Sequence, residues 1–76
     1  MNKTRRLALA AIMERLEELK ADLEEVLEEE EEAKDNIPES LWGTDRYEAA
    51  EAAVDNLQEA VSYMEEVLDY IEEARA

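Results

Sequence analysis

The side chains of this chain that could carry chemistry are almost all carboxylates. The sequence has 23 Asp and Glu residues but no His and no Cys. Without these two residue types, Ser40 and Ser62 have no base to activate them as nucleophiles. Carboxylate pairs can act as general acid and base, but only in a pocket that shifts their pKa values. Two helices, predicted below, cannot enclose such a pocket, so we expect a protein that is not an enzyme.

A metal site would need a recognisable arrangement of these carboxylates. Helical di-iron sites use Glu-x-x-His pairs, zinc sites use Cys or His, and calcium loops contain an Asp-x-Asp-x-Asp-Gly pattern. None of these patterns occurs in the sequence. We therefore expect no metal and no cofactor.

The most acidic segment is the run Glu28–Glu32, in a chain whose net charge is −15. This charge argues against direct contact with nucleic acid or with anionic membrane surfaces, and it favours a basic protein partner. The run has two interpretations. It is either a solvated helix face or an acidic surface that imitates nucleic-acid phosphates, and the residues of that surface would be Glu28, Glu29, Glu31 and Glu32.

The elements that position these residues are long helices. Ala, Glu and Leu dominate, and the single Pro and single Gly both lie near the middle of the chain. Pro38 ends the first helix and Gly43 follows a single helical turn, so we expect one domain, 1–76, with a helix over 4–35, a connection over 36–44 and a helix over 45–75. Asp45 is the expected cap of the second helix, and Glu48 would complete a capping box.

Apolar residues in both helices alternate in steps of three and four, the spacing of a coiled-coil seam. The predicted seam contains Leu9, Ile12, Leu16, Leu19, Leu23, Val26, Glu30 and Ala33, and from the second helix Tyr47, Ala50, Val54, Leu57, Val61, Met64, Leu68 and Ile71. When the helices are placed antiparallel so that the numbers of facing residues add to 80, the two stripes pair without a slip. Lys20 then lies near Glu65, and Lys34 lies near Glu51. The expected fold is all-α, an antiparallel two-helix hairpin that resembles a coiled coil.

Three apolar residues stand in the connection: Ile37, Leu41 and Trp42. One interpretation is that they plug the open end of the helix pair, over Tyr47. The other is that they are exposed and anchor a partner, as interface hot spots do.

A second apolar stripe runs along the second helix beside the seam. Its residues are Ala53, Ala60, Val67 and Ala74, with Tyr63 and Tyr70 next to them. A helix that is apolar over so wide an arc usually buries it against another element. The alanines alone could simply favour the helix, but that does not account for Val67 and the tyrosines. We expect a homo-oligomer, most simply a homodimer in which two hairpins form a four-helix bundle.

No segment suggests a membrane or a leader. Lys3, Arg5 and Arg6 precede a short apolar run, but the run passes directly into charged residues and has no cleavage site. No stretch approaches the roughly 20 apolar residues of a transmembrane helix. We expect a cytoplasmic protein, and the Met1 start suggests a complete small reading frame.

The middle of the chain resembles a known group of proteins. Asp35-Asn36-Ile37-Pro38-Glu39-Ser40-Leu41, followed by Arg46-Tyr47-Glu48 and Asp55-Asn56-Leu57, is similar to small acidic helical proteins of unknown function from Firmicutes phages and mobile elements. The similarity covers roughly residues 20–72, and Trp42 departs from it where those proteins often have Gln. The resemblance implies a phage or mobile-element origin, hence host cytosol, but assigns no functional residue.

Three functions follow as hypotheses. The first is a non-catalytic protein–protein interaction module of a phage or mobile element, which binds and inhibits a host defence or regulatory protein. The second is an acidic mimic of nucleic acid in the basic groove of a nuclease or DNA-binding protein. The third is an oligomeric sponge for a small signalling molecule, or a structural component.

Overall fold

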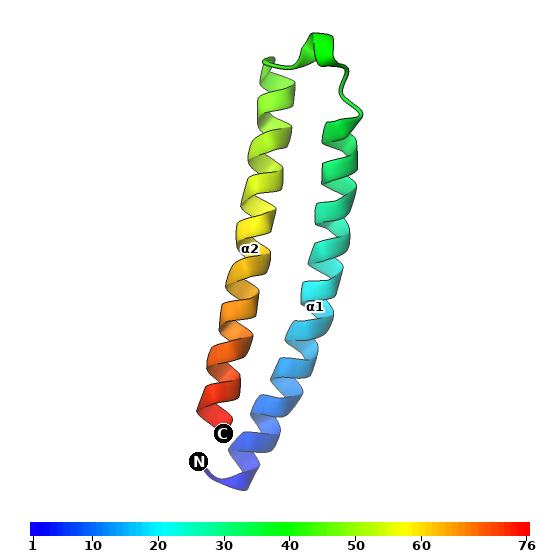
Figure 1. Ribbon diagram of the computed structural model, residues 1–76. Helices are drawn as coiled ribbons and strands as arrows, with labels where there is room; N and C mark the ends of the chain where they lie inside the picture. Colours follow the sequence, from blue (N-terminus) through cyan, green and yellow to red (C-terminus); the bar gives the residue numbers. More distant parts are fainter.

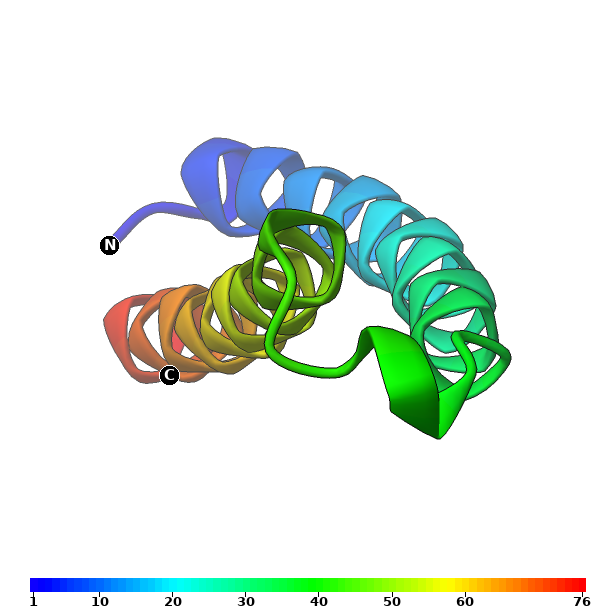
Figure 2. The same ribbon diagram turned by 90° about the horizontal axis from the view of Figure 1, so that it is seen from above.

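The chain folds into an antiparallel pair of long α-helices, as the sequence predicts. The computed structural model describes residues 1–76, with α1 at Lys3–Asp35, the 3-10 turn η1 at Glu39–Leu41 and α2 at Asp45–Arg75. The helices lie side by side, with η1 at one end and both termini at the other (Figure 1). The Cα positions extend over 59 × 15 × 13 Å. Seen from the turn end, the helices are inclined to each other, as in a coiled pair (Figure 2).

Each helix begins at a side-chain cap. The Asn2 side chain accepts a hydrogen bond of 2.8 Å from the Arg5 backbone N–H at the start of α1. At the start of α2 the cap is Thr44, whose hydroxyl accepts from the Tyr47 backbone N–H at 3.4 Å. The predicted Asp45 cap is therefore wrong by one residue. The extended backbone of Thr44 aims its oxygen at the free amides, while Asp45 already lies in the first turn, where its charge favours the helix dipole.

The connection forms the single helical turn that its Pro and Gly predict. The Leu41 N–H donates to the Pro38 carbonyl at 2.8 Å, and the Trp42 N–H donates to the Glu39 carbonyl at 3.1 Å. Gly43 then adopts φ +88°, in the left-handed region that only glycine enters without strain. The turn thereby reverses the chain between residues 36 and 44 and brings α2 back along α1.

The seam of α2 is the predicted one. All eight of its predicted seam residues are buried or half-buried. On α1 only half of the prediction holds, because Leu9, Leu16 and Leu23 are half-buried but Leu19 and Val26 are 57% and 51% exposed. The other half of the α1 seam consists of residues one position later, and all of them are half-buried: Met13, Lys20, Leu27 and Lys34.

The contacts between the helices confirm the predicted register only in part. Lys20 does meet Glu65, with Nζ 3.3 Å from Oε1, as predicted. A second link joins the Gln58 side-chain amide to the Glu31 carboxylate at 3.3 Å, whereas Lys34 forms no ion pair with Glu51. The first link is the one that the predicted register gives, whereas the second link is not, and the predicted Lys34–Glu51 pair is missing. The four predicted layers that use Ile12, Leu19, Val26 and Ala33 are lost, because these residues lie off the seam.

The hairpin has a very thin core. Only Ile37 and Val54 are buried, at 5% and 4% exposure, and every other seam side chain keeps some contact with water. Two helices meeting along one line cannot surround their side chains, because each helix covers only one side of the other. Little apolar area therefore stabilises the isolated hairpin.

We predict that two valine truncations will separate the observed seam from the predicted one. Val54→Ala should lower the free energy of unfolding by about 1–2 kcal/mol, because it removes buried methyl groups. Val26→Ala, at an exposed position, should change it by less than about 0.5 kcal/mol. Urea titrations followed by helical circular dichroism, on chains diluted until each is a monomer, measure both. Equal losses would mean that Val26 belongs to the seam.

Candidate interaction surface

The hairpin has two long faces, one on each side of the plane that contains both helices. The first is polar, and cross-helix links identify it. Lys20 with Glu65, and Glu31 with Gln58, join the helices along this side. We call it the polar face.

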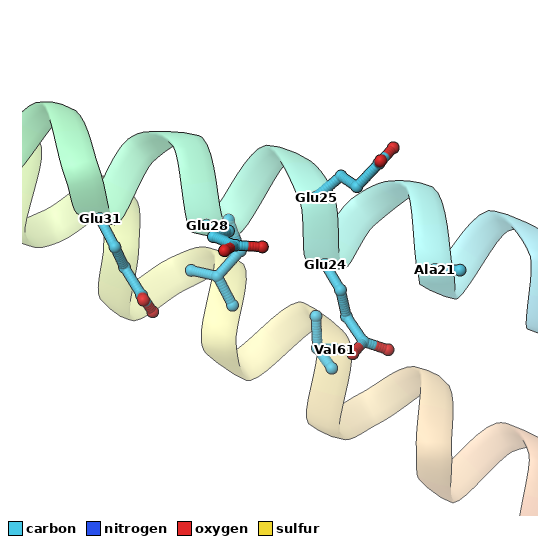
Figure 3. A pocket seen from close by; sticks show the side chains of 7 residues that line it. Ala21, Glu24, Glu25, Glu28, Glu31 and Val61 are labelled. Carbon is cyan, nitrogen blue, oxygen red and sulfur yellow. The ribbon is translucent and has the colours of Figure 1, made fainter.

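A shallow open hollow lies on the polar side of α1 (Figure 3). Its volume is about 520 Å³, and carboxylates make up much of its wall: the lining residues are Ala21, Glu24, Glu25, Leu27, Glu28, Glu31 and Val61. In Figure 3 Glu25 points away from α2, while Glu31 extends toward it. The carboxylates do not converge, and no group of three or more in the chain could hold a metal ion. The hollow is not shaped to enclose a substrate.

The opposite face is apolar. One residue turns a helix by about 100°, so residues one position before the seam lie on one flank of their helix. In α1 the residues Ile12, Leu19 and Val26 each precede a seam residue, and in α2 Ala60 and Val67 do the same. Polar residues that also precede seam residues alternate with them along this flank: Arg15, Asp22, Glu29 and Asn56. Because the helices are antiparallel and face each other, these two flanks point to the same side of the hairpin.

A second observation supports this placement. One shallow hollow near the turn is lined from both flanks, by Ala33 of α1 together with Arg46 and Ala49 of α2. The flanks of the two helices therefore join in one surface, which we call the apolar face. Its residues are Ile12, Leu19, Val26 and Ala33 of α1 with Ala53, Ala60, Tyr63, Val67, Tyr70 and Ala74 of α2.

The large side chains of the apolar face are open to solvent. Tyr70 is 70% exposed, and Tyr63, Val67 and Ile12 are also exposed, whereas Ala53 and Ala60 are half-buried beside the seam. The stripe on α2 was singled out from the sequence. Its continuation on α1 was missed, because Ile12, Leu19 and Val26 had been assigned to the seam. The sequence did contain a signal for the observed α1 seam, because Met13 and Leu27 are apolar and have the same spacing as Ile12 and Val26.

The predicted acidic surface divides between two settings. Glu28, Glu29 and Glu32 are exposed, but Glu31 is half-buried and accepts the Gln58 hydrogen bond on the polar face. Glu30 is also half-buried, on the seam itself. The run is therefore spread around α1 and does not form one continuous patch.

The three apolar residues of the connection have different roles. Ile37 is buried and plugs the end of the helix pair. The Trp42 indole N–H donates to the Ile37 carbonyl at 3.1 Å, and its ring stacks on Tyr47 with centroids 5.5 Å apart. Trp42 is nevertheless 50% exposed, and Leu41 is exposed as well. The trio thus combines a plug at Ile37 with an open apolar rim at Leu41 and Trp42.

Lys20 is the one charged side chain of the seam that is fixed by ion pairs on both helices. Its ammonium lies 3.3 Å from Glu65 and 3.4 Å from Glu24, one turn along α1. The hydrogen bond to Glu65 chiefly raises the pKa of Lys20, desolvation opposes this, and the charges of Glu24 and Glu65 add to the rise. The lysine stem fills the seam while its charge stays at the polar face.

No family model, curated protein or solved structure matches this chain. Neither helix has a stretch long and apolar enough to cross a membrane.

We predict that Trp42 stabilises the turn end. Trp42→Ala should lower the free energy of unfolding by about 1–2 kcal/mol, because it removes both the stack and the hydrogen bond. Trp42→Phe, which keeps an aromatic ring on Tyr47, should lose about half as much. Urea unfolding followed by circular dichroism measures both. If neither variant loses stability, Trp42 contributes nothing to the fold, and its exposed ring would then be free to act as a partner anchor.

The ion pairs of Lys20 predict a loss of stability in alkali. Because folding raises the pKa of Lys20, its ion pairs stabilise the folded state at pH values below the ordinary lysine pKa of about 10.4. This stabilisation is lost as the pH rises through the pKa that Lys20 has in the folded state. Lys20→Met should therefore remove part of the fall in melting temperature between about pH 9 and pH 11.5. Lys3→Met, in an exposed position, is the control. Identical pH profiles for the two variants would contradict the assignment.

Proposed function

We propose that this protein is a non-catalytic protein–protein interaction module of the cytoplasm, and that its binding surface is the apolar face. The observation that carries the proposal is the exposure of Leu19, Val26, Val67 and two tyrosines on one side of a molecule with only two buried residues. A contiguous exposed apolar surface on a small domain usually marks an interaction site.

The chemistry of the apolar face suits a helical partner. Small alanines, such as Ala53 and Ala60, allow close approach of a helix backbone along the middle of the face. Tyr63 and Tyr70 stand at its edge, where a ring can pack while its hydroxyl stays in water. An amphipathic helix with anchors at i, i+3 and i+7 would fit along such a stripe. The resemblance of the Asp35–Leu41 segment to phage proteins supports a host protein as the target.

A nucleic-acid mimic is the second candidate, and the distribution of charge favours it. Residues 21–35 contain nine acidic residues and one basic residue. Such a segment would attract a basic groove mainly by long-range charge, so its binding should weaken steeply as salt rises. Binding through the apolar face should instead persist at high salt. Salt dependence therefore separates the two candidates.

The proposal predicts where a partner will be cross-linked. A photo-reactive benzoyl-phenylalanine in place of Val67 should form adducts with a foreign protein in the cells that carry this chain. The same residue in place of Ser62, exposed on the same helix but outside the apolar face, is the matched control. Adducts identified by mass spectrometry at 67 but not at 62, and unchanged in 0.5 M salt, are the expected result.

Two results would contradict this proposal. Foreign adducts at 62 as abundant as those at 67 would remove the apolar face as the binding surface. Adducts that form only at low salt would favour the acidic mimic. Adducts between two copies of the chain itself are distinguished by their mass, and they bear on the inference below.

A further inference from the structure

The apolar face, proposed above as the binding surface, also fits a second copy of the same chain in one particular orientation. We infer that two hairpins pack apolar face to apolar face with their turns at opposite ends, so that α1 lies antiparallel to α1 of the second copy and α2 antiparallel to α2. The inference rests on the proposed function, because it uses the same face. It specifies the occupant of that face in the free protein and its direction, so a foreign partner would compete with the second copy.

Surface area supports a second copy. The chain exposes 5760 Å², whereas a compact monomer of 8.8 kDa would expose about 4,800 Å² by the scaling of area with mass. The excess is on the order of 1,000 Å² per chain. Two chains would together bury roughly 2,000 Å², which is the size of a stable protein–protein interface.

The distribution of charge selects the orientation. Residues 1–20 carry five basic and three acidic side chains, a net charge of +2, while residues 21–35 carry one basic and nine acidic, a net charge of −8. Turns at the same end would place both −8 segments at the same end of the dimer, each opposite α2 of the second copy. Turns at opposite ends place each −8 segment beside a +2 segment, which reduces the repulsion between two chains of net charge −15.

Side-chain sizes on α1 agree with this orientation. The α1 helices of the two copies can be paired antiparallel so that the numbers of facing residues add to 45. Leu19 then lies opposite Val26 of the second copy, and Ile12 lies opposite Ala33. Arg15, at the edge of the face, then lies near Glu29 of the second copy. One contact is unfavourable, because Asp22 approaches Asp22 of the second copy near the twofold axis.

The α2 helices match independently. When their residue numbers add to 123, each tyrosine of the face meets an alanine, with Tyr63 opposite Ala60 and Tyr70 opposite Ala53, while Val67 lies opposite Asn56. The twofold axis then passes between residues 61 and 62 of α2 and between 22 and 23 of α1. Of the two cross-helix links, Lys20–Glu65 lies nearer to these points, and its residue numbers add to 85 against 84 for the axis, so the points lie at about the same height in the hairpin. A single axis therefore serves both helix pairs.

Single-cysteine variants test the orientation, since the native chain has no cysteine. Asp22→Cys should form a disulfide-linked dimer under mild oxidation as the main product, because the axis places the two sulfurs together. Ala21→Cys, one residue away and turned toward the polar side, should not. If the turns lie at the same end, Asp22→Cys will stay unlinked, while a mixture of Val26→Cys and Ala60→Cys chains will cross-link. That result would overturn the orientation.

Sedimentation equilibrium at tens of micromolar chain in 150 mM salt tests the association itself. We expect a dimer, and Leu19→Glu should raise its dissociation constant at least roughly thirtyfold. Leu7→Glu, an equally exposed leucine of α1 outside the face, should not. Asp22→Asn should lower the dissociation constant roughly fivefold by removing the like-charge contact.

A native chain that sediments as a strict monomer would overturn the inference. Foreign adducts at residue 67 would still support the proposed function in that case, so the two failures are distinguishable. Circular dichroism of Leu19→Glu should match that of the native chain, because Leu19 is exposed in the single hairpin.

Discussion

The seam between α1 and α2 is the contact on which the whole structure depends. No third element covers it, and Val54 is its only buried residue, while Ile37 of the connection is buried at its turn end. The turn end is held by the Trp42 stack on Tyr47 and by the hydrogen bond to the Ile37 carbonyl, while Lys20 joins the helices near the middle. Each of these contacts aligns two helices that apolar burial alone would hold only weakly.

The architecture of this chain was predictable because its signals are local. Pro38 and Gly43 are the only helix breakers, and they act on the residues beside them, so the helix bounds agree with the prediction to within a residue. The α2 seam was also predictable, since Val54, Leu57 and Val61 stand out from small or polar neighbours. The cap at Thr44 shows the limit of such reasoning, because Thr44 and Asp45 both carry suitable oxygens and only the backbone geometry separates them.

The α1 seam was not predictable, for a physical reason. Leu9, Leu16 and Leu23 are flanked on one side by Ile12, Leu19 and Val26 and on the other by Met13, Lys20 and Leu27. Both sets have the spacing of a seam, and the set without a lysine is the more apolar. In the structure the lysine-containing set faces α2, and Lys20 pairs with Glu65 there. The apolar face therefore spans both helices, and it cannot be recognised from the sequence of either helix alone.

The thin core has a consequence for how the single hairpin responds to heat and denaturant. Unfolding it exposes little apolar surface that water did not already reach, so the change in heat capacity is small. Its stability curve is then flat over temperature, its melting is broad, and its dependence on urea concentration is shallow. The helix ends beyond the last seam contacts fray well before the middle. A hairpin of this kind, when it is alone, therefore unfolds gradually over a wide range of temperature.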